Sequence, residues 1–309
     1  MDRPAKLLSV GALTLDTILR VETLPVHQGK FMAADGVQIA SGMATSAACA
    51  ARRLGAEVWL WASAGDDQVG DQLISGIEAE GVDCSLVRRV AGARSALAAI
   101  LVDGHGERII VPFYDQRAQA DPDGLPVADL TAFDAVLVDV RWPGAAALAL
   151  SAARAARRPG ILDADTAPLA VLERLLPLAS HIVASEPAAR IVCGQAADPQ
   201  AACAYLASRT DAFVAVTAGG AGTWWHDRHA GCVRHVAAPK IKVVDTLAAG
   251  DVFHGAFAAG LGQAMPIEEA LRFASAAAAL KCQRFGGRLG APDKAETLAM
   301  MTATWPEGA

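Results

Sequence analysis

Several features on which common protein classes depend are missing from this sequence of 309 residues. Its longer stretches without Asp, Glu, Lys or Arg, such as residues 252–267, fall short of the roughly 18–20 apolar residues that a membrane-spanning helix needs. Positive charge is scarce as well, since 27 Lys and Arg face 33 Asp and Glu, for a net charge of −6. Proteins that bind nucleic acid through phosphate contacts usually carry a basic excess. We therefore expect neither a membrane protein nor a nucleic-acid binder.

Aromatic residues and paired cysteines are also scarce. The aromatic content of 5% is low for an all-β domain, because strands favour aromatic and β-branched residues. The six cysteines are scattered and form no C-x-x-C pair, which is typical of buried thiols in a reduced compartment. Hydrophobic residues, in contrast, make up 53% of a chain rich in Ala and Gly. This composition excludes global disorder and predicts a cytoplasmic α/β protein.

The chain alternates between short apolar runs and Ala-rich segments of helical character. The runs that we expect to form buried strands are residues 6–10, 58–64, 135–140, 160–163, 181–184 and 213–217. The segments that we expect to form helices are residues 46–54, 71–80, 145–156, 251–261 and 268–282. This alternation predicts a mostly parallel sheet with helices on both sides. Residues 15–39 and 94–114 are strand-like without an intervening helix, and we expect them to pair in a small antiparallel sheet.

The most informative motif is D-T-L-A-A-G-D-V-F-H-G-A-F at residues 245–257. Small residues let the backbone N–H groups of Ala249, Gly250 and Asp251 converge, and the N-terminus of the following helix adds partial positive charge. Such a turn suits a phosphate whose charge grows during transfer. The Asp251 carboxylate beside it is placed to take a proton from an attacking hydroxyl. The alternative is that Asp251 only caps the helix. Neither a P-loop nor a G-x-G-x-x-G fingerprint is present, so nucleotide binding through those two motifs is excluded.

Residues 245–258 resemble the second signature of the PfkB, or ribokinase-like, carbohydrate kinases. The similarity extends over nearly the whole chain and includes the G-x-D-x-x-G turn at residues 65–70 and the V-T-x-G-x-x-G motif at residues 216–222. It implies one domain over residues 1–309, with the ribokinase-like three-layer α/β/α sandwich and a β lid formed by about residues 15–39 and 94–114. It also implies ATP and Mg2+ as cofactors, a sugar substrate, and a homodimer through the lid.

The same resemblance implies roles for individual residues. In the phosphoryl-transfer site, Asp251 is the base, and Ala248, Ala249 and Gly250 stabilise the transferred group. The residues implied in sugar binding are Asp16, Gly42 and Ser46. The residues implied in nucleotide binding are Ser185, Thr217, Gly219 and Gly222.

Within the family, residues 139–142, 185–187, 106–110 and 272–293 are most similar to bacterial sulfofructose kinases. Those enzymes hold a sulfonate with a lysine, an asparagine and an arginine. Lys30 and Arg141 fall on two of these positions, whereas Pro112 takes the place of the asparagine. The resemblance therefore implies a cationic pocket for an anionic sugar, with sulfonate itself less well matched.

Other departures keep further interpretations open. The N-x-x-E of the family, which orders magnesium through water, falls on residues 185–188 and keeps neither end. A kinase for fructose, 2-keto-3-deoxygluconate or a nucleoside is one alternative. A sugar- or nucleotide-binding homologue without turnover is another.

Three further groups of residues admit more than one role. Asp163 and Asp165 end a strand and could bind a metal or a hydroxyl or cap the next helix. Arg108 is expected to be a surface charge of the lid, although it could reach substrate. The last group has zinc-capable side chains at His226, His229, Cys232 and His235. Because strand alternation would turn these to opposite faces, we expect an exposed hairpin and no metal held by protein side chains.

Overall fold

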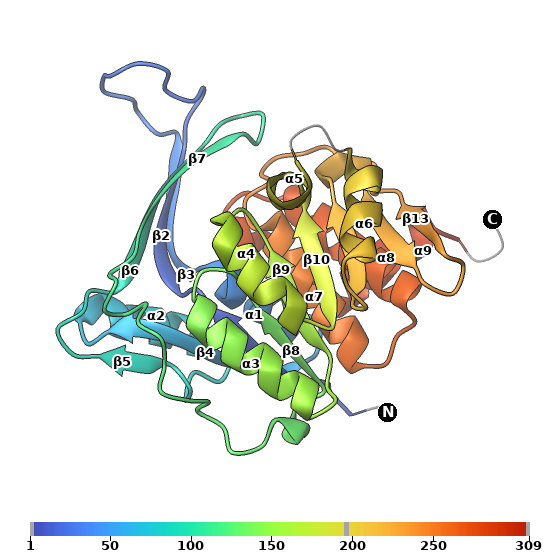
Figure 1. Ribbon diagram of the computed structural model, residues 1–309. Coiled ribbons are helices and arrows are strands. Elements are labelled where there is room, and N and C mark those ends of the chain that lie inside the picture. The colour runs from blue at the N-terminus through green and yellow to red at the C-terminus, as the bar shows by residue number, and fades with distance from the viewer. Residues whose placement is uncertain (1–2, 195–197, 307–309) are drawn as a thin grey trace.

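The apolar runs expected to be buried strands come together in one large sheet. The computed structural model describes residues 3–194 and 198–306. Within these residues the large sheet has the order β13-β12-β11-β10-β9-β8-β1-β4-β5 (Figure 1). Its strands are β1 (Lys6–Gly11), β4 (Glu57–Gly65), β5 (Arg88–Val90), β8 (Ala135–Val138), β9 (Gly160–Ala164), β10 (His181–Ser185), β11 (Phe213–Thr217), β12 (Thr223–Asp227) and β13 (Cys232–Val236). The strands from β5 to β11 in this order run parallel, and only β12 and β13 are antiparallel to their neighbours. The predicted mostly parallel sheet is confirmed.

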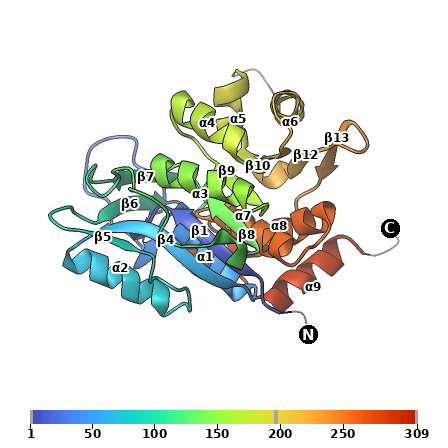
Figure 2. The same ribbon diagram turned by 60° about the horizontal axis from the view of Figure 1, so that its bottom comes forward.

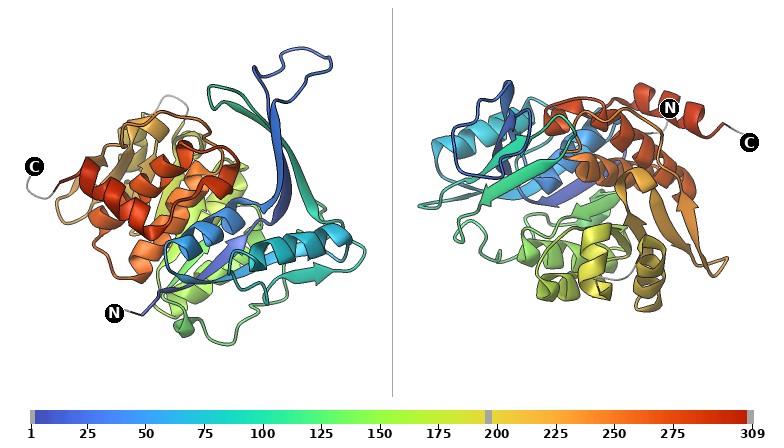
Figure 3. Two further views of the ribbon diagram at one scale, coloured as in Figure 1. Left: turned by 180° about the vertical axis from the view of Figure 1, so that it is seen from behind. Right: turned by 90° about the horizontal axis from the view of Figure 1, so that it is seen from above.

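Helices cover both faces of this sheet and make it the middle of three layers (Figure 2). On one face lie α1 (Met43–Arg53), α2 (Gln68–Glu78), α7 (Ala249–Gly262), α8 (Ile267–Cys282) and α9 (Lys294–Thr304). On the other lie α3 (Pro143–Ala155), α4 (Leu169–Leu175), α5 (Glu186–Cys193) and α6 (Pro199–Ser208). The view from above in Figure 3 shows the same layering. Each face has its own apolar core, because strands buried on both sides present side chains to both layers.

Helices α1 and α7 pack closely because their contact surfaces consist of small residues. A Cβ added to Gly255 would lie 2.2 Å from the carbonyl oxygen of Ala47. Only glycine fits at this crossing. The approach brings the middle of α7 against α1, which comes directly after strand β3 (Asp35–Ser41).

Four strands form a second, smaller sheet, which stands away from the body of the molecule (Figure 1). They are β2 (Thr14–Arg20), β3 (Asp35–Ser41), β6 (Ala96–Val102) and β7 (Arg108–Phe113), in the order β3-β2-β6-β7. The two outer pairs are antiparallel, whereas β2 and β6 run parallel to each other. The predicted segments 15–39 and 94–114 thus coincide with this sheet. Its inner face buries Ile18 and Ile100 together with Leu247 of the main domain.

The carboxyl ends of the parallel strands meet at one edge of the large sheet, where open α/β sheets place their ligands. The residues at or just beyond these ends include Asp139, Asp163, Ser185 and Thr217. The described part of the chain contains no helix with the length and hydrophobicity needed to cross a membrane.

Candidate active site

A tight turn leads from Asp245 into helix α7. Its last residue, Ala248, is the N-cap of α7 and has the left-handed backbone conformation, with φ of 62°. The Ala249 N–H donates to the carbonyl oxygen of Thr246 at 3.2 Å. The N–H groups of Gly250 and Asp251 come next, in the first helical turn, where backbone donors have no acceptor within the helix. The turn therefore offers two N–H groups and the positive end of α7 to an anion.

Asp251 stands in this first turn with part of its side chain still accessible. Burial raises the pKa of its carboxyl well above the usual range, and the negative charge of Asp163 raises it further. The neighbouring His254 acts in the opposite direction. A carboxylate with a raised pKa is a better proton acceptor. The role of base inferred for Asp251 is thus chemically consistent with its surroundings.

His254 is a functional candidate that the sequence reasoning did not single out. It is 2% exposed, and its Nδ1 lies 2.7 Å from the carbonyl oxygen of Gly250 and 3.3 Å from Oδ2 of Asp163. Its Nε2 lies 3.1 Å from the carbonyl oxygen of Val183. Burial lowers the pKa of His254, although the carbonyl oxygens of Val183 and Gly250 counteract that effect. The sequence offered one indication of this role: His254 is a polar residue on the side of the helix that is expected to be buried.

Asp163 and Asp165 are now distinguishable. Asp163 is buried and faces His254. Asp165 accepts from Arg141 Nη2 at 3.0 Å and from Ser185 Oγ at 3.1 Å. The capping alternative is wrong for both, because the N-cap of α4 is Pro168. At the carboxyl edge of the sheet, Asp163 thus pairs with His254 and Asp165 with Arg141.

A cavity of about 220 Å³ lies beside the turn. Three of the four predicted nucleotide-binding residues, Thr217, Gly219 and Gly222, line it together with Ala249 and Gly250. The apolar part of its wall consists of Ala238, Pro239, Ile241, Val243, Phe253, Ala278 and Ala279. Glycines and apolar side chains in one cavity wall suit a planar base that approaches the backbone closely.

Two of the residues predicted to bind nucleotide, Gly222 and Ser185, also stabilise the local fold. Gly222 has φ of 99°, and a Cβ there would lie 2.3 Å from the carbonyl oxygen of Val236. The hydroxyl of Ser185 caps α5 by accepting from the Ala188 N–H at 3.3 Å. Ser185 therefore acts at the edge of the site, between Asp165 and helix α5.

The predicted sugar-side residues gather where the small sheet meets α1. Asp16 is buried in β2, accepts from Thr14 Oγ1 at 2.6 Å and has a pKa raised by burial. The hydroxyl of Ser46 lies 3.2 Å from that of Ser41. Gly42 has φ of 109° and passes so close to Ala12 that a Cβ would lie 2.5 Å from its carbonyl oxygen.

The buried Asp139 connects these segments, which the sequence reasoning did not foresee. Its carboxylate accepts from the backbone N–H groups of Ala12 (2.8 Å), Ala44 (3.0 Å) and Arg141 (2.8 Å). A Cβ on Gly11 would lie 2.2 Å from this carboxylate. Asp139 thereby fixes the ends of β1 and β8 and the start of α1 around one point. The only indication of this role in the sequence is that Asp139 directly follows an apolar run expected to be a buried strand.

The two cations expected to form an anion pocket are not brought together. Arg141 donates to Asp165 and to the carbonyl oxygen of Thr166 at 2.9 Å. Lys30 is exposed in the loop of residues 21–34, which projects away from the large sheet (Figures 1 and 3). That loop joins β2 and β3 outside the paired part of the small sheet, so strand pairing does not hold it over the site. Tyr114 is the side chain found near Arg141 instead: its pKa is raised by burial and by Asp139, Asp16 and Asp251, and lowered by Arg141.

Arg108 was expected to be a surface charge of the small sheet, but its side chain contacts the turn before α7. Its Nη1 donates to Thr246 Oγ1 at 2.8 Å, and this hydroxyl donates to the carbonyl oxygen of Gly106 at 2.8 Å. The turn between β6 and β7 therefore contacts the turn that precedes α7. This contact links the small sheet to the nucleotide side of the site.

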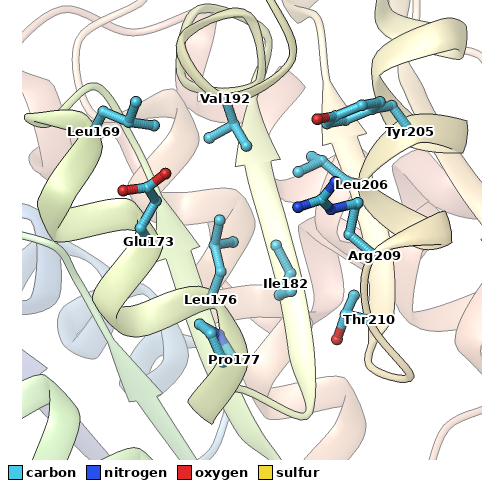
Figure 4. Close-up of a pocket in the computed structure, with 10 residues that line it drawn as sticks. All are labelled: Leu169, Glu173, Leu176, Pro177, Ile182, Val192, Tyr205, Leu206, Arg209 and Thr210. Atoms are coloured by element: carbon cyan, nitrogen blue, oxygen red, sulfur yellow. The ribbon is translucent and has the colours of Figure 1, made fainter.

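Two other features lie apart from this edge. A cavity of about 280 Å³ runs between α4, α5 and α6, with Glu173 and Arg209 on opposite sides of an apolar floor (Figure 4). Strands β12 and β13 form the predicted hairpin, in which His226 pairs with Val233 and Asp227 with Cys232. Among residues 3–194 and 198–306, no three His, Cys, Asp or Glu side chains are arranged to hold a metal ion.

The three-layer fold carries a small-residue turn at the N-terminus of α7, a carboxyl group with a raised pKa and an adjoining cavity, an arrangement that suits a phosphotransferase. Residues 4–294 match the family model for pfkB family carbohydrate kinases, so the chain belongs to that family and is a kinase with an alcohol acceptor. The specific resemblance to sulfofructose kinases is not shown by the comparisons, in which several of the most similar curated proteins are ribokinases. The chain is 28% identical to the ribokinase of Haemophilus influenzae over 303 residues, covering 94% of this chain and 97% of that protein.

Solved structures show the same relationship. A crystal structure of a candidate ribokinase from Agrobacterium tumefaciens has a TM-score of 0.94 and 45% identity, covering 97% of this chain and 98% of that one. The Arabidopsis thaliana ribokinase, in complex with ribose and ATP, shares the fold with a TM-score of 0.81 at 24% identity, over 97% of this chain and 99% of that one.

Proposed function

We propose that this pfkB family kinase transfers the γ-phosphate of ATP to a primary hydroxyl of a small sugar. The observation that carries the proposal is the position of Asp251 in the turn next to the nucleotide-side cavity. The ribokinases among its relatives make ribose the first candidate substrate.

The geometry supports a role for each part of the site. Thr217, Gly219 and Gly222 receive the nucleotide beside the N-terminus of α7. Ala248 sets the path of the backbone, so that the N–H groups of Gly250 and Asp251 stabilise charge on the transferred phosphoryl group. Asp251 accepts the proton of the attacking hydroxyl. Asp16, Gly42 and Ser46 hold the sugar hydroxyls on the opposite side.

Mg2+ is proposed to accompany the nucleotide. Magnesium bound to phosphates neutralises charge that develops during phosphoryl transfer, and it commonly keeps several water ligands. The donor set here fits that mode, because Asp163 and Asp165 lie near Asp251 but are engaged by His254 and by Arg141. Water ligands facing this acidic edge would replace direct coordination.

A second candidate substrate is an anionic ketose such as sulfofructose. Arg141 at the end of β8 is the observation that favours it, since two of its donors are already oriented at the site edge. Movement of the loop of residues 21–34 would have to bring Lys30 to the same ligand.

The small sheet, residues 15–39 and 94–114, is proposed to act as the lid of the site and as a dimer interface. Its inner face carries Asp16 and already contacts Leu247 and Thr246. Closure would exclude water and so suppress ATP hydrolysis. The proposed location is the cytoplasm, where ATP and reduced thiols are available.

The test is coupled ADP release with ATP, magnesium and a panel of ribose, fructose, sulfofructose, 2-keto-3-deoxygluconate and a nucleoside. We expect turnover with ribose or another pentose, and Asp251→Asn should lower kcat by about 10²–10⁴-fold with unchanged ATP affinity. Asp129→Asn, which changes the exposed N-cap of the short 3-10 helix Leu130–Ala132, is the control. Unchanged turnover in Asp251→Asn would refute the mechanism. Silence of the wild type with every acceptor, despite ATP binding, would favour the binding protein without turnover.

A further inference from the structure

Lys281 is a fully buried lysine in the last turn of helix α8. Its side chain is 0% exposed, although lysines are almost never fully buried unless they are paired. Helix α8 otherwise buries mainly alanines and other apolar residues in this region. A charge held at such a place requires specific partners, because burying an unpaired ammonium is strongly unfavourable.

The partners of Lys281 belong to a single residue, Asp245. The ammonium Nζ lies 2.6 Å from the main-chain oxygen of Asp245 and 3.2 Å from its Oδ2. Asp245 is itself 0% exposed. The ammonium therefore neutralises the buried carboxylate of Asp245. It also donates a hydrogen bond to the Asp245 carbonyl oxygen, which lies outside the helices and strands.

The same carboxylate receives three backbone donors from two segments. Its Oδ1 accepts from the Leu247 N–H at 2.8 Å. Its Oδ2 accepts from the N–H groups of Gly286 (3.1 Å) and Gly287 (3.0 Å). In addition, the Val244 and Asp245 N–H groups donate to the carbonyl oxygen of Cys282 at 2.8 and 3.2 Å. The start of the phosphate-binding turn is thus tied to the end of α8 from several directions, with Lys281 at the centre.

This arrangement controls the path of the chain from Asp245 into helix α7. Leu247, which donates to the Asp245 carboxylate, directly precedes Ala248. The left-handed backbone of Ala248 sets the direction in which the first turn of α7 begins. If the Asp245 carboxylate lacked its counter-charge, its negative charge would also oppose an incoming phosphate. The ammonium therefore holds the backbone of the turn in place and also neutralises the negative charge of Asp245 beside it.

We propose that Lys281 is a positioning residue whose buried ammonium acts as a built-in cation, holding residues 245–250 in the phosphate-binding geometry without a cation from solvent. The proposal rests on the proposed function, since it assigns the turn to phosphate binding. It assigns to Lys281 an effect on the terminal phosphate, exerted through Asp245 and not through contact with substrate.

The experiment compares the wild type, Lys281→Ala and the control Lys294→Ala, an exposed lysine at the start of α9. Steady-state rates are measured in choline, potassium or ammonium chloride at equal ionic strength. The wild type and Lys294→Ala should show rates that are the same in all three salts. Lys281→Ala should lose about 10²-fold in kcat, the effect of a misplaced catalytic turn, and ammonium or potassium should restore part of the loss whereas choline should not.

A second readout needs no sugar and separates this proposal from the proposed function. Binding of a non-hydrolysable ATP analogue and of ADP is measured with magnesium for the same variants. Lys281→Ala should lose the preference of the wild type for the triphosphate, and ammonium should restore it. This result would support the role of Lys281 even if the wild type phosphorylated none of the sugars tested.

A variant with a neutral pair covers the case in which Lys281→Ala does not fold. Asp245→Asn combined with Lys281→Met removes both charges and should show the loss of kcat and of triphosphate preference without rescue by any cation. The proposal is overturned if either variant retains wild-type kcat and triphosphate preference. It is equally overturned if the wild type itself requires potassium or ammonium for activity.

Discussion

At the scale of single residues, the site depends on carboxylates whose surroundings differ sharply. Asp139 is fixed by three backbone donors and organises the chain. Burial raises the pKa of Asp251, and the neighbouring acid Asp163 raises it further. The pair Asp163 and His254 sits behind Asp251, and the histidine moderates this effect. One carboxylate is therefore suited to hold structure and the other to accept a proton.

The raised pKa of Asp251 predicts how the rate depends on pH. Asp251 accepts a proton only when ionised, so kcat/KM should fall as the pH drops through its raised pKa, above the usual carboxyl range near 4. Asp163→Asn removes the neighbouring negative charge, which should lower the pKa of Asp251 and shift the acid limb to lower pH. A kcat/KM profile for the wild type and this variant measures the shift, and Asp129→Asn serves as control. An acid limb that does not move in Asp163→Asn would contradict the assignment.

The motif at residues 245–257 was sufficient to predict the turn and the helix from sequence, because those features depend on local residue types. The role of Asp251 as the base stays a prediction. The roles of Asp139, His254 and Lys281 were not accessible in this way. Each depends on partners far along the chain, such as Ala12 for Asp139 and Val183 for His254. A lysine near a helix end is ordinarily solvated, so only tertiary packing could show that Lys281 is buried.

At the scale of elements, the important junction is between the β6–β7 turn and the turn before α7. Thr246 receives a hydrogen bond from Arg108 and donates one to Gly106. The small sheet is thus hydrogen-bonded directly to the turn before α7. The sequence predicted both strands but not this contact, because loops of different elements meet only in the folded chain.

Loss of this junction should weaken coupling between lid and nucleotide. Arg108→Ala and Thr246→Val should each raise KM for ATP by about two- to tenfold, the worth of one hydrogen bond. Because Thr246→Val removes the Arg108 hydrogen bond together with the one to Gly106, the double variant should be no worse than Thr246→Val alone. Thr246→Ser keeps the hydroxyl and should behave as wild type. Fully additive effects in steady-state kinetics would show that the two residues act separately.

At the scale of the whole molecule, the small sheet has an apolar face that no other part of residues 3–194 and 198–306 covers. Leu19, Leu97, Ile109 and Val111 are between 37% and 62% exposed. Strand register places them on the same face, opposite Asp16 and Ile100. Exposed apolar patches of this kind commonly mark protein–protein interfaces.

This face predicts the oligomeric state. The wild type should sediment as a dimer, and Val111→Glu should shift it toward monomer because a charge would be buried at the interface. Leu169→Glu, which changes a 43% exposed leucine on α4, should leave the dimer intact. Analytical ultracentrifugation distinguishes these cases, and a dimeric Val111→Glu variant would place the interface elsewhere.

The close crossing of α1 and α7 has a consequence for how the protein is made. About 200 residues of chain separate α1 from α7, which corresponds to on the order of 10–40 s of synthesis on the ribosome. During that interval the alanine-rich surface of α1 and the apolar strands beneath it lack their permanent cover. The emerging chain should therefore be a client of chaperones, and nucleotide can stabilise it only once the segment carrying α7 and α8 has left the ribosome.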